Sequence, residues 1–164
     1  MFKQHFDFCH DYGTKAEKKF AQKHLSNIVY SNKKQDMYDH WDVSGKLNNI
    51  DNENKLFDVK TTKRLNHSKD IGVMDSVWVE GKNIHGNKGW IYGIADYIVF
   101  EREETWMVVD RKELLDLTLK KLKENNYKKG KGVYLIHTRF GRKDKVTKVL
   151  FDDIKTIKHY ELTK

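Results

Sequence analysis

Two short apolar runs, each interrupted by an aspartate, constrain the fold of this chain more than any other feature. The first is Trp41-Asp42-Val43 and the second is Leu56-Phe57-Asp58-Val59-Lys60. In an extended strand the side chains alternate between faces, so Asp58 and Lys60 point the same way. A buried carboxylate costs free energy unless another charge compensates it. We therefore expect two neighbouring buried strands that bring Asp42 to Asp58 and Lys60, where two close acids either share a proton or bind a divalent cation.

A third acid lies upstream, on a helix that the pattern predicts over residues 13–28. At about 100° per residue, His24 and Ile28 fall on one apolar face, and Glu17 lies near the middle of that face. The same glutamate also fits a capping box that begins at Thr14, in which it would bond a backbone N–H at the helix start. The order of a helical glutamate, an aspartate on a strand and then Asp-x-Lys favours a catalytic site over the cap.

That order resembles the PD-(D/E)XK nuclease superfamily. The glycine and the helical glutamate, Gly13 and Glu17, are similar to its Holliday-junction resolvase branch, and the motifs cover about residues 13–64. The chain departs from the pattern in one respect: Trp41 stands where a proline would precede Asp42, and the chain contains no proline. This proline is the least essential residue of the motif.

The resemblance implies a role for each residue of the motif. Glu17, Asp42, Asp58 and the backbone carbonyl of Val59 would hold Mg²⁺, with Mn²⁺ as the expected substitute. Lys60 would orient or activate the attacking water. The implied activity is Mg²⁺-dependent hydrolysis of phosphodiester bonds in branched or Holliday-junction DNA. A nicking or restriction-type nuclease of the same fold is one alternative, and a non-catalytic nucleic-acid-binding protein is the other.

The charge of the chain favours a nucleic acid as partner. The formal net charge is +8 and the sequence pI is about 9.3, and each phosphate that Lys or Arg neutralises releases counterions. Most basic runs are only solvated surface. Lys63 and Arg64 directly follow the second acid-bearing strand, so we expect them to reach a phosphate at the site. Lys88, in the glycine-rich stretch 86–93, is a further candidate DNA contact, although a simple turn between strands explains that stretch as well.

Length and patterning favour one α/β domain over residues 1–164. The resemblance implies a restriction-endonuclease-like arrangement, with a mixed central sheet flanked by helices. The pattern predicts strands over residues 76–80, 97–102, 105–109, 133–140 and 145–151. A capping box at Asp110 and Glu113 predicts a helix with a stripe of Leu115, Leu119 and Leu122 that ends before Gly130. A short helix is expected over residues 152–157.

No apolar run is long enough to span a membrane, and residues 1–12 lack a signal-peptide core. We expect a cytoplasmic protein, in the host cytoplasm if it is phage-encoded, since residues 86–101 are reminiscent of phage members of the superfamily. The only cysteine, Cys9, excludes an internal disulfide. Resolution of a junction implies a homodimer, for which Phe2, Phe6 and Phe8 are candidate interface residues.

Several other residues fit either a core or a functional role. Trp90, Tyr92 and Tyr97 would stack on exposed bases or pack in the core. Asp96 and Glu80 lie in otherwise apolar strand patterns and are candidates for additional acids near the metal.

Overall fold

The computed structural model describes residues 14–61 and 75–164. These residues divide into two compact units. Residues 14–61, 94–108 and 160–164 belong to the first unit, and residues 75–93 and 109–159 belong to the second. The expectation of a single domain over residues 1–164 therefore stays a prediction.

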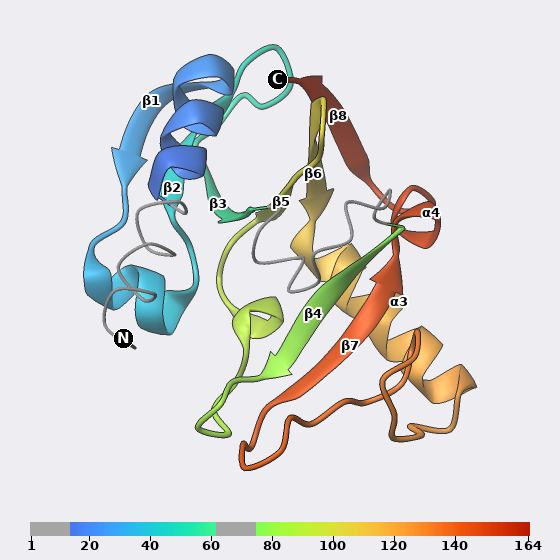
Figure 1. Cartoon of the computed structure of the whole chain (residues 1–164). Coiled ribbons are helices and arrows are strands. Elements are labelled where there is room, and N and C mark those ends of the chain that lie inside the picture. The colour runs from blue at the N-terminus through green and yellow to red at the C-terminus, as the bar shows by residue number, and fades with distance from the viewer. Residues whose placement is uncertain (1–13, 62–74) are drawn as a thin grey trace. The chain divides into compact units, whose positions relative to one another are not determined.

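The first unit is built on a six-stranded sheet with the order β1-β2-β3-β5-β6-β8 (Figure 1). Its β1–β2 and β2–β3 pairs are antiparallel, and its β3–β5 pair is parallel, so the sheet is mixed. The α/β class and the mixed central sheet are confirmed, and the restriction-endonuclease-like arrangement stays a prediction. The strands are β1 (Leu25–Tyr30), β2 (Val43–Leu47), β3 (Lys55–Lys60), β5 (Tyr97–Glu101), β6 (Thr105–Asp110) and β8 (His159–Thr163).

A helix over residues 14–24 covers one face of this sheet. Phe20 is fully buried on it, and its ring centroid lies 5.6 Å from those of Phe57 on β3 and Trp106 on β6. Burying such rings contributes about 1.5–3 kcal/mol each. Because Phe57 and Val59 belong to this core, the alternation along β3 directs Asp58 and Lys60 to the opposite face.

The predicted helix over residues 13–28 is wrong in its C-terminal part, because the helix ends at His24 and β1 begins at Leu25. Asn27 has a φ of 55°, within an irregularity of the β1–β2 pairing. Leu25 and Tyr30 pair with Leu47 and Val43 of β2. Pairing with β2 therefore overrides the helical pattern that the apolar residues suggest.

The second unit contains an antiparallel two-stranded ribbon of β4 (Ser76–Lys82) and β7 (Lys145–Leu150). Its helices are η2 (Trp90–Tyr92), α3 (Arg111–Glu124) and α4 (Phe151–Ile154). The remaining short helix, η1 (Gln35–Asp39), belongs to the first unit. The strands predicted over 76–80, 97–102, 105–109 and 145–151 are confirmed as β4, β5, β6 and β7, with shifts of one or two residues at their ends. β8 was not predicted.

Helix α3 begins at its predicted cap but buries a different face. The Asp110 carboxylate accepts a hydrogen bond from the Glu113 N–H at 3.1 Å, whereas Glu113 accepts one from the Lys158 N–H at 2.7 Å instead of closing the capping box. The predicted leucine stripe is wrong, because Leu114 and Thr118 are the buried residues of this helix. The Thr118 hydroxyl donates to the Leu114 carbonyl at 2.7 Å, so its burial leaves no hydroxyl unsatisfied.

The strand predicted over 133–140 is also wrong. Val133 and His137 form only isolated bridges with β7, one parallel and one antiparallel. Between them Tyr134 has a φ of 56°, which a bulky residue rarely adopts and which breaks an extended strand. The expected helix over 152–157 is shorter and begins earlier, as α4.

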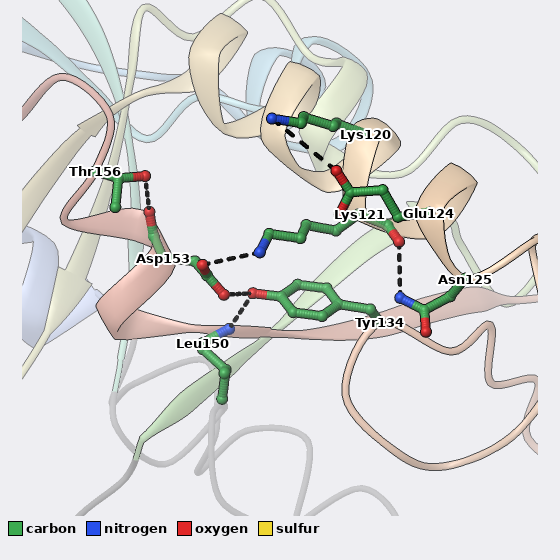
Figure 2. A network of polar contacts seen from close by, with 8 residues as sticks. All are labelled: Lys120, Lys121, Glu124, Asn125, Tyr134, Leu150, Asp153 and Thr156. Atoms are coloured by element: carbon green, nitrogen blue, oxygen red, sulfur yellow. Dashed lines mark hydrogen bonds and ion pairs between the residues drawn. The ribbon is translucent and has the colours of Figure 1, made fainter.

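A polar network in the second unit holds Tyr134 in this conformation (Figure 2). Its hydroxyl donates to the Asp153 carboxylate and accepts from the Leu150 N–H at 3.2 Å. Lys121 on α3 lies 3.0 Å from Asp153 and also sits over the Tyr134 ring. The hydrogen bond from Tyr134 and the nearby Lys121 charge hold the pKa of Asp153 below its ordinary value. The network thus ties α3 and α4 to the segment before β7.

None of the helices among the described residues is long and apolar enough to cross a membrane.

Candidate active site

Asp42 directly precedes β2 and is held in place by the two strands beside it. Its N–H donates to the Phe57 carbonyl at 2.8 Å, and its carbonyl accepts from the Ser31 N–H at 2.9 Å. Its carboxylate Oδ2 accepts a hydrogen bond from the Val59 N–H at 2.7 Å. Pairing of Val43 with Phe57 sets this register, so the β2–β3 antiparallel pair brings the two acid-bearing runs together.

Asp58 and Lys60 lie on one face of β3, as the alternation predicts. Lys60 Nζ lies 2.6 Å from Asp58 Oδ1, and the two side chains are only 13% and 3% exposed. Breaking such a buried pair by removing one partner leaves an uncompensated buried charge, which is strongly unfavourable. The ion pair therefore fixes the position of both groups.

Asp42 is influenced by the charges of the three other motif residues. Burial raises the pKa of the Asp42 carboxyl well above its usual range, and the negative charges of Asp58 and Glu17 raise it further. The Lys60 ammonium and the hydrogen bond from the Val59 N–H act in the opposite direction. The structure therefore brings Glu17, Asp42, Asp58 and Lys60 into one electrostatic cluster, which we call the acid–lysine cluster. Clusters with perturbed carboxyl pKa values are common at functional sites.

Two features bear on whether this cluster fits a divalent cation. Asp58 Oδ2 is buried and has no hydrogen-bond partner among the described residues, and carboxylate and carbonyl oxygens are the ligands that Mg²⁺ prefers. Across residues 14–61 and 75–164, however, no three His, Cys, Asp or Glu side chains already form a metal-holding group. Asp58 Oδ1 and Asp42 Oδ2 are engaged by Lys60 and the Val59 N–H. The donor types fit Mg²⁺, and binding would require these oxygens to turn toward it.

Other acids and histidines of the first unit have local roles. Asp96, which the sequence offered as an extra acid, accepts a hydrogen bond from the Leu56 N–H at 2.8 Å and so ties the start of β5 to β3. His24 is partly buried beside Phe20, and burial, with the Lys23 charge, lowers its pKa. Ser31, whose N–H fixes the Asp42 carbonyl, was missed, because no sequence pattern marks a backbone donor.

The predicted nucleic-acid contacts are only partly described. Lys63 and Arg64 lie outside the described residues, as do Gly13, Phe2, Phe6, Phe8 and Cys9. Lys88 is exposed and lies in the second unit, where it bridges Lys82.

The glycine-rich stretch around Lys88 forms a turn followed by η2. A side chain at Gly89 would lie 2.3 Å from the Glu80 carbonyl oxygen, so the close approach of these backbones requires glycine. Of the aromatic residues considered for stacking, Tyr97 is buried in the core, Trp90 is partly buried and Tyr92 is exposed. Glu80 also lies in the second unit.

No protein-family model, curated protein or solved structure matches this chain.

Replacing Glu17 with glutamine separates its two possible roles. Glutamine keeps a side chain that can serve a capping box but removes the charge that a hard cation prefers. If Glu17 is a ligand, we expect an unchanged melting temperature with weaker Mg²⁺ affinity and slower DNA cleavage. Titration with Mg²⁺ and a thermal melt measure the two quantities. Unchanged cleavage in Glu17→Gln would return the residue to a capping role.

Proposed function

We propose that this protein is a Mg²⁺-dependent DNA endonuclease that hydrolyses phosphodiester bonds. The observation that carries the proposal is the acid–lysine cluster, in which the buried Asp58–Lys60 ion pair and the charge of Glu17 act on Asp42, whose carboxyl pKa is raised. This is the set of groups that metal-assisted phosphodiester hydrolysis uses.

Each residue of the cluster has a stated task in this proposal. Asp42, Asp58, Glu17 and the Val59 carbonyl would hold the cation, which supplies Lewis-acid chemistry at the scissile phosphate. Lys60 orients the attacking water, and its charge offsets the negative charge that grows on the phosphoryl oxygens. The Val59 N–H holds the Asp42 carboxylate in position through the 2.7 Å hydrogen bond.

Nucleic acid is the proposed substrate because of the net charge of +8. The preference for branched or junction DNA comes from the resemblance to resolvases. Two symmetric cuts across a four-way junction call for a two-fold dimer, because a C2 interface repeats one site on each side. The proposal therefore includes a homodimer.

The alternative is a nucleic-acid-binding protein without catalytic activity. One observation favours it: Asp58 and Asp42 already bond Lys60 and the Val59 N–H, which is also what a purely structural cluster would do. A nuclease panel separates the two readings. The panel contains a four-way junction, a flap, a linear duplex and a single strand of matched length, each with Mg²⁺, Mn²⁺ or EDTA.

We expect metal-dependent cleavage with the junction preferred, and light scattering should give a dimer. A protein that binds these DNAs and cuts none with either metal would be the non-catalytic alternative. A monomer that cuts the linear duplex as readily as the junction would remove the resolvase assignment and leave the nuclease chemistry standing.

A further inference from the structure

The two units differ sharply in charge. Among the described residues, the first unit carries 11 Lys and Arg against 12 Asp and Glu, and the second carries 17 against 9. In the described part of the chain, the excess of positive charge therefore belongs to the unit that does not carry the acid–lysine cluster. Such an excess attracts a polyanion.

Within the second unit, lysines gather at one end of the β4–β7 ribbon. Lys82 and Lys145 are direct register partners across the two strands, and Lys82 also bridges Lys88. All three are exposed. Like charges opposite one another destabilise a sheet. A bound anion would remove that repulsion, so the arrangement points to a ligand at this end of the ribbon.

The loop that enters β7 extends the same positive surface. Arg142 and Lys143 are exposed, and the Lys143 N–H donates to the Ile84 carbonyl at 3.3 Å. That bond places the loop beside the turn after β4, and the two turns lie side by side in Figure 1. We define the basic end as Lys82, Lys88, Arg142, Lys143 and Lys145.

Hydrogen bonds to a buried carboxylate hold the loop that enters β7. The fully buried Asp144 accepts hydrogen bonds from both the N–H, at 3.1 Å, and the side chain of Arg139. Burial alone would raise the pKa of Asp144, but the bonds and charge of Arg139 hold it below its ordinary value, so Asp144 is a carboxylate at neutral pH and can accept both bonds. Within it, the Arg142 N–H donates to the Arg139 carbonyl, and Gly141 has a φ of 70°, as a type II turn requires at its third residue.

At the tip of this turn Phe140 is fully exposed to solvent. A hydrogen-bonded turn with an exposed phenyl ring, followed by the exposed Arg142 and Lys143, is suited to an unpaired base and its flanking phosphates, since every base has a face on which an aromatic ring can stack. We propose that the basic end and Phe140 form a binding site for single-stranded nucleic acid, in which Phe140 stacks on a base while Arg142, Lys143 and the three lysines contact phosphates.

The choice of nucleic acid over another polyanion rests on the proposed function, because the first unit carries phosphodiester chemistry only in that proposal. An anionic membrane is the competing partner. It is less well suited, because one exposed ring gives little insertion and stable attachment takes a second apolar anchor or lipid chain. A strand of nucleic acid offers both a base for Phe140 and several phosphates for the cations of the basic end.

Binding is measured by fluorescence anisotropy in EDTA, so that no cleavage occurs, with a labelled single strand and a blunt duplex of the same length. Phe140→Ala should weaken single-strand affinity about 5- to 150-fold and duplex affinity much less. The double variant Arg142→Ala with Lys143→Ala should weaken both, and should lower the slope of log affinity against log salt by roughly 1.4–1.8.

The matched control is Lys112→Ala with Lys120→Ala, which removes two exposed lysines from α3 of the same unit. It changes the net charge equally and should leave most of the affinity and the slope in place. Equal losses in the control and in the loop variants would overturn the site, as would wild-type single-strand affinity in Phe140→Ala. Binding to phosphatidylserine vesicles with no binding to DNA would assign the surface to membranes and overturn it too.

The same assay separates this site from the nuclease. If the protein binds DNA through Phe140 but cuts none, the proposed nuclease function is wrong and the proposed binding site stands. If the protein cuts DNA but the loop variants bind as well as the wild type, the proposed binding site is wrong and the proposed nuclease activity stands.

Discussion

Replacing Lys60 with alanine should slow DNA cleavage by about 100-fold or more while DNA affinity largely survives. Lys60 Nζ lies 2.6 Å from Asp58 Oδ1. Its positive charge also lowers the pKa of Asp42, against the effects of burial and the neighbouring acids that raise it. Without the lysine, the transition state loses a positive charge and the acids lose their compensating partner. Single-turnover cleavage at saturating Mg²⁺ measures the chemical step apart from binding.

Two comparisons make this result specific. Lys55→Ala changes the same residue type on the same strand, where the side chain pairs with the exposed Glu53 at 3.5 Å, and it should cleave as the wild type does. Asp58→Asn keeps the shape of the side chain but removes its charge, so it should be as slow as Lys60→Ala. Because it also removes the carboxylate that pairs with the Lys60 ammonium, a thermal melt should accompany the rate measurement to show that the variant is folded. Cleavage in Asp58→Asn at the wild-type rate would remove the proposed site.

Replacing Asp42 with asparagine should abolish cleavage and raise the stability of the protein. Burial and the charges of Asp58 and Glu17 raise the pKa of Asp42 in the folded state above its ordinary value of 3.8. Between the ordinary and the raised pKa the folded state binds more protons than the unfolded state, so ionisation of Asp42 removes stability as the pH rises through that range. Asparagine avoids this loss and can still accept the hydrogen bond from the Val59 N–H.

The measurement is a series of thermal melts from acidic to neutral pH. The stabilisation by Asp42→Asn should grow as the pH rises, and each kcal/mol gained should raise the melting temperature by about 2–4 °C for a chain of this size. Asp36→Asn, at an exposed position of η1, should change the stability by less than about 0.5 kcal/mol at every pH. A lower melting temperature for Asp42→Asn at neutral pH would contradict the assigned direction of the shift.

The two predictions describe one balance between stability and function. Burial and the negative charges of Asp58 and Glu17 disfavour the ionised form of Asp42, so ionisation of Asp42 costs the folded protein stability. Such strain is common where a site is arranged for catalysis or for a cation. A structural cluster gains nothing from that repulsion, so a variant that is more stable and inactive would favour the nuclease over the non-catalytic alternative.

Much of the local structure was predictable from the sequence. Strands β3, β4, β5, β6 and β7 have dense β-branched and aromatic residues, and α3 has a cap at Asp110 that the pattern reveals. The shared face of Asp58 and Lys60 follows from the two-residue period of a strand alone. These features depend on residues that are close to one another along the chain, so they can be read from the sequence alone.

Other elements were decided by partners far along the chain. Leu25–Tyr30 has a helical pattern but pairs with β2, and Tyr134 breaks an apparent strand because Asp153 and Leu150 hold its hydroxyl. The buried face of α3 depends on a hydrogen bond inside the helix that lets Thr118 leave the solvent.

The candidate site divides in the same way. The sequence by itself determined that Asp58 and Lys60 share a face, because that is a property of one strand. Only the tertiary structure decided that Asp42 bonds the Val59 N–H and that Glu17 lies close enough to raise the pKa of Asp42, because these contacts depend on the register of β2 against β3 and on the packing of a helix against the sheet. Register and packing arise from the summed burial of many side chains, and no short motif encodes them.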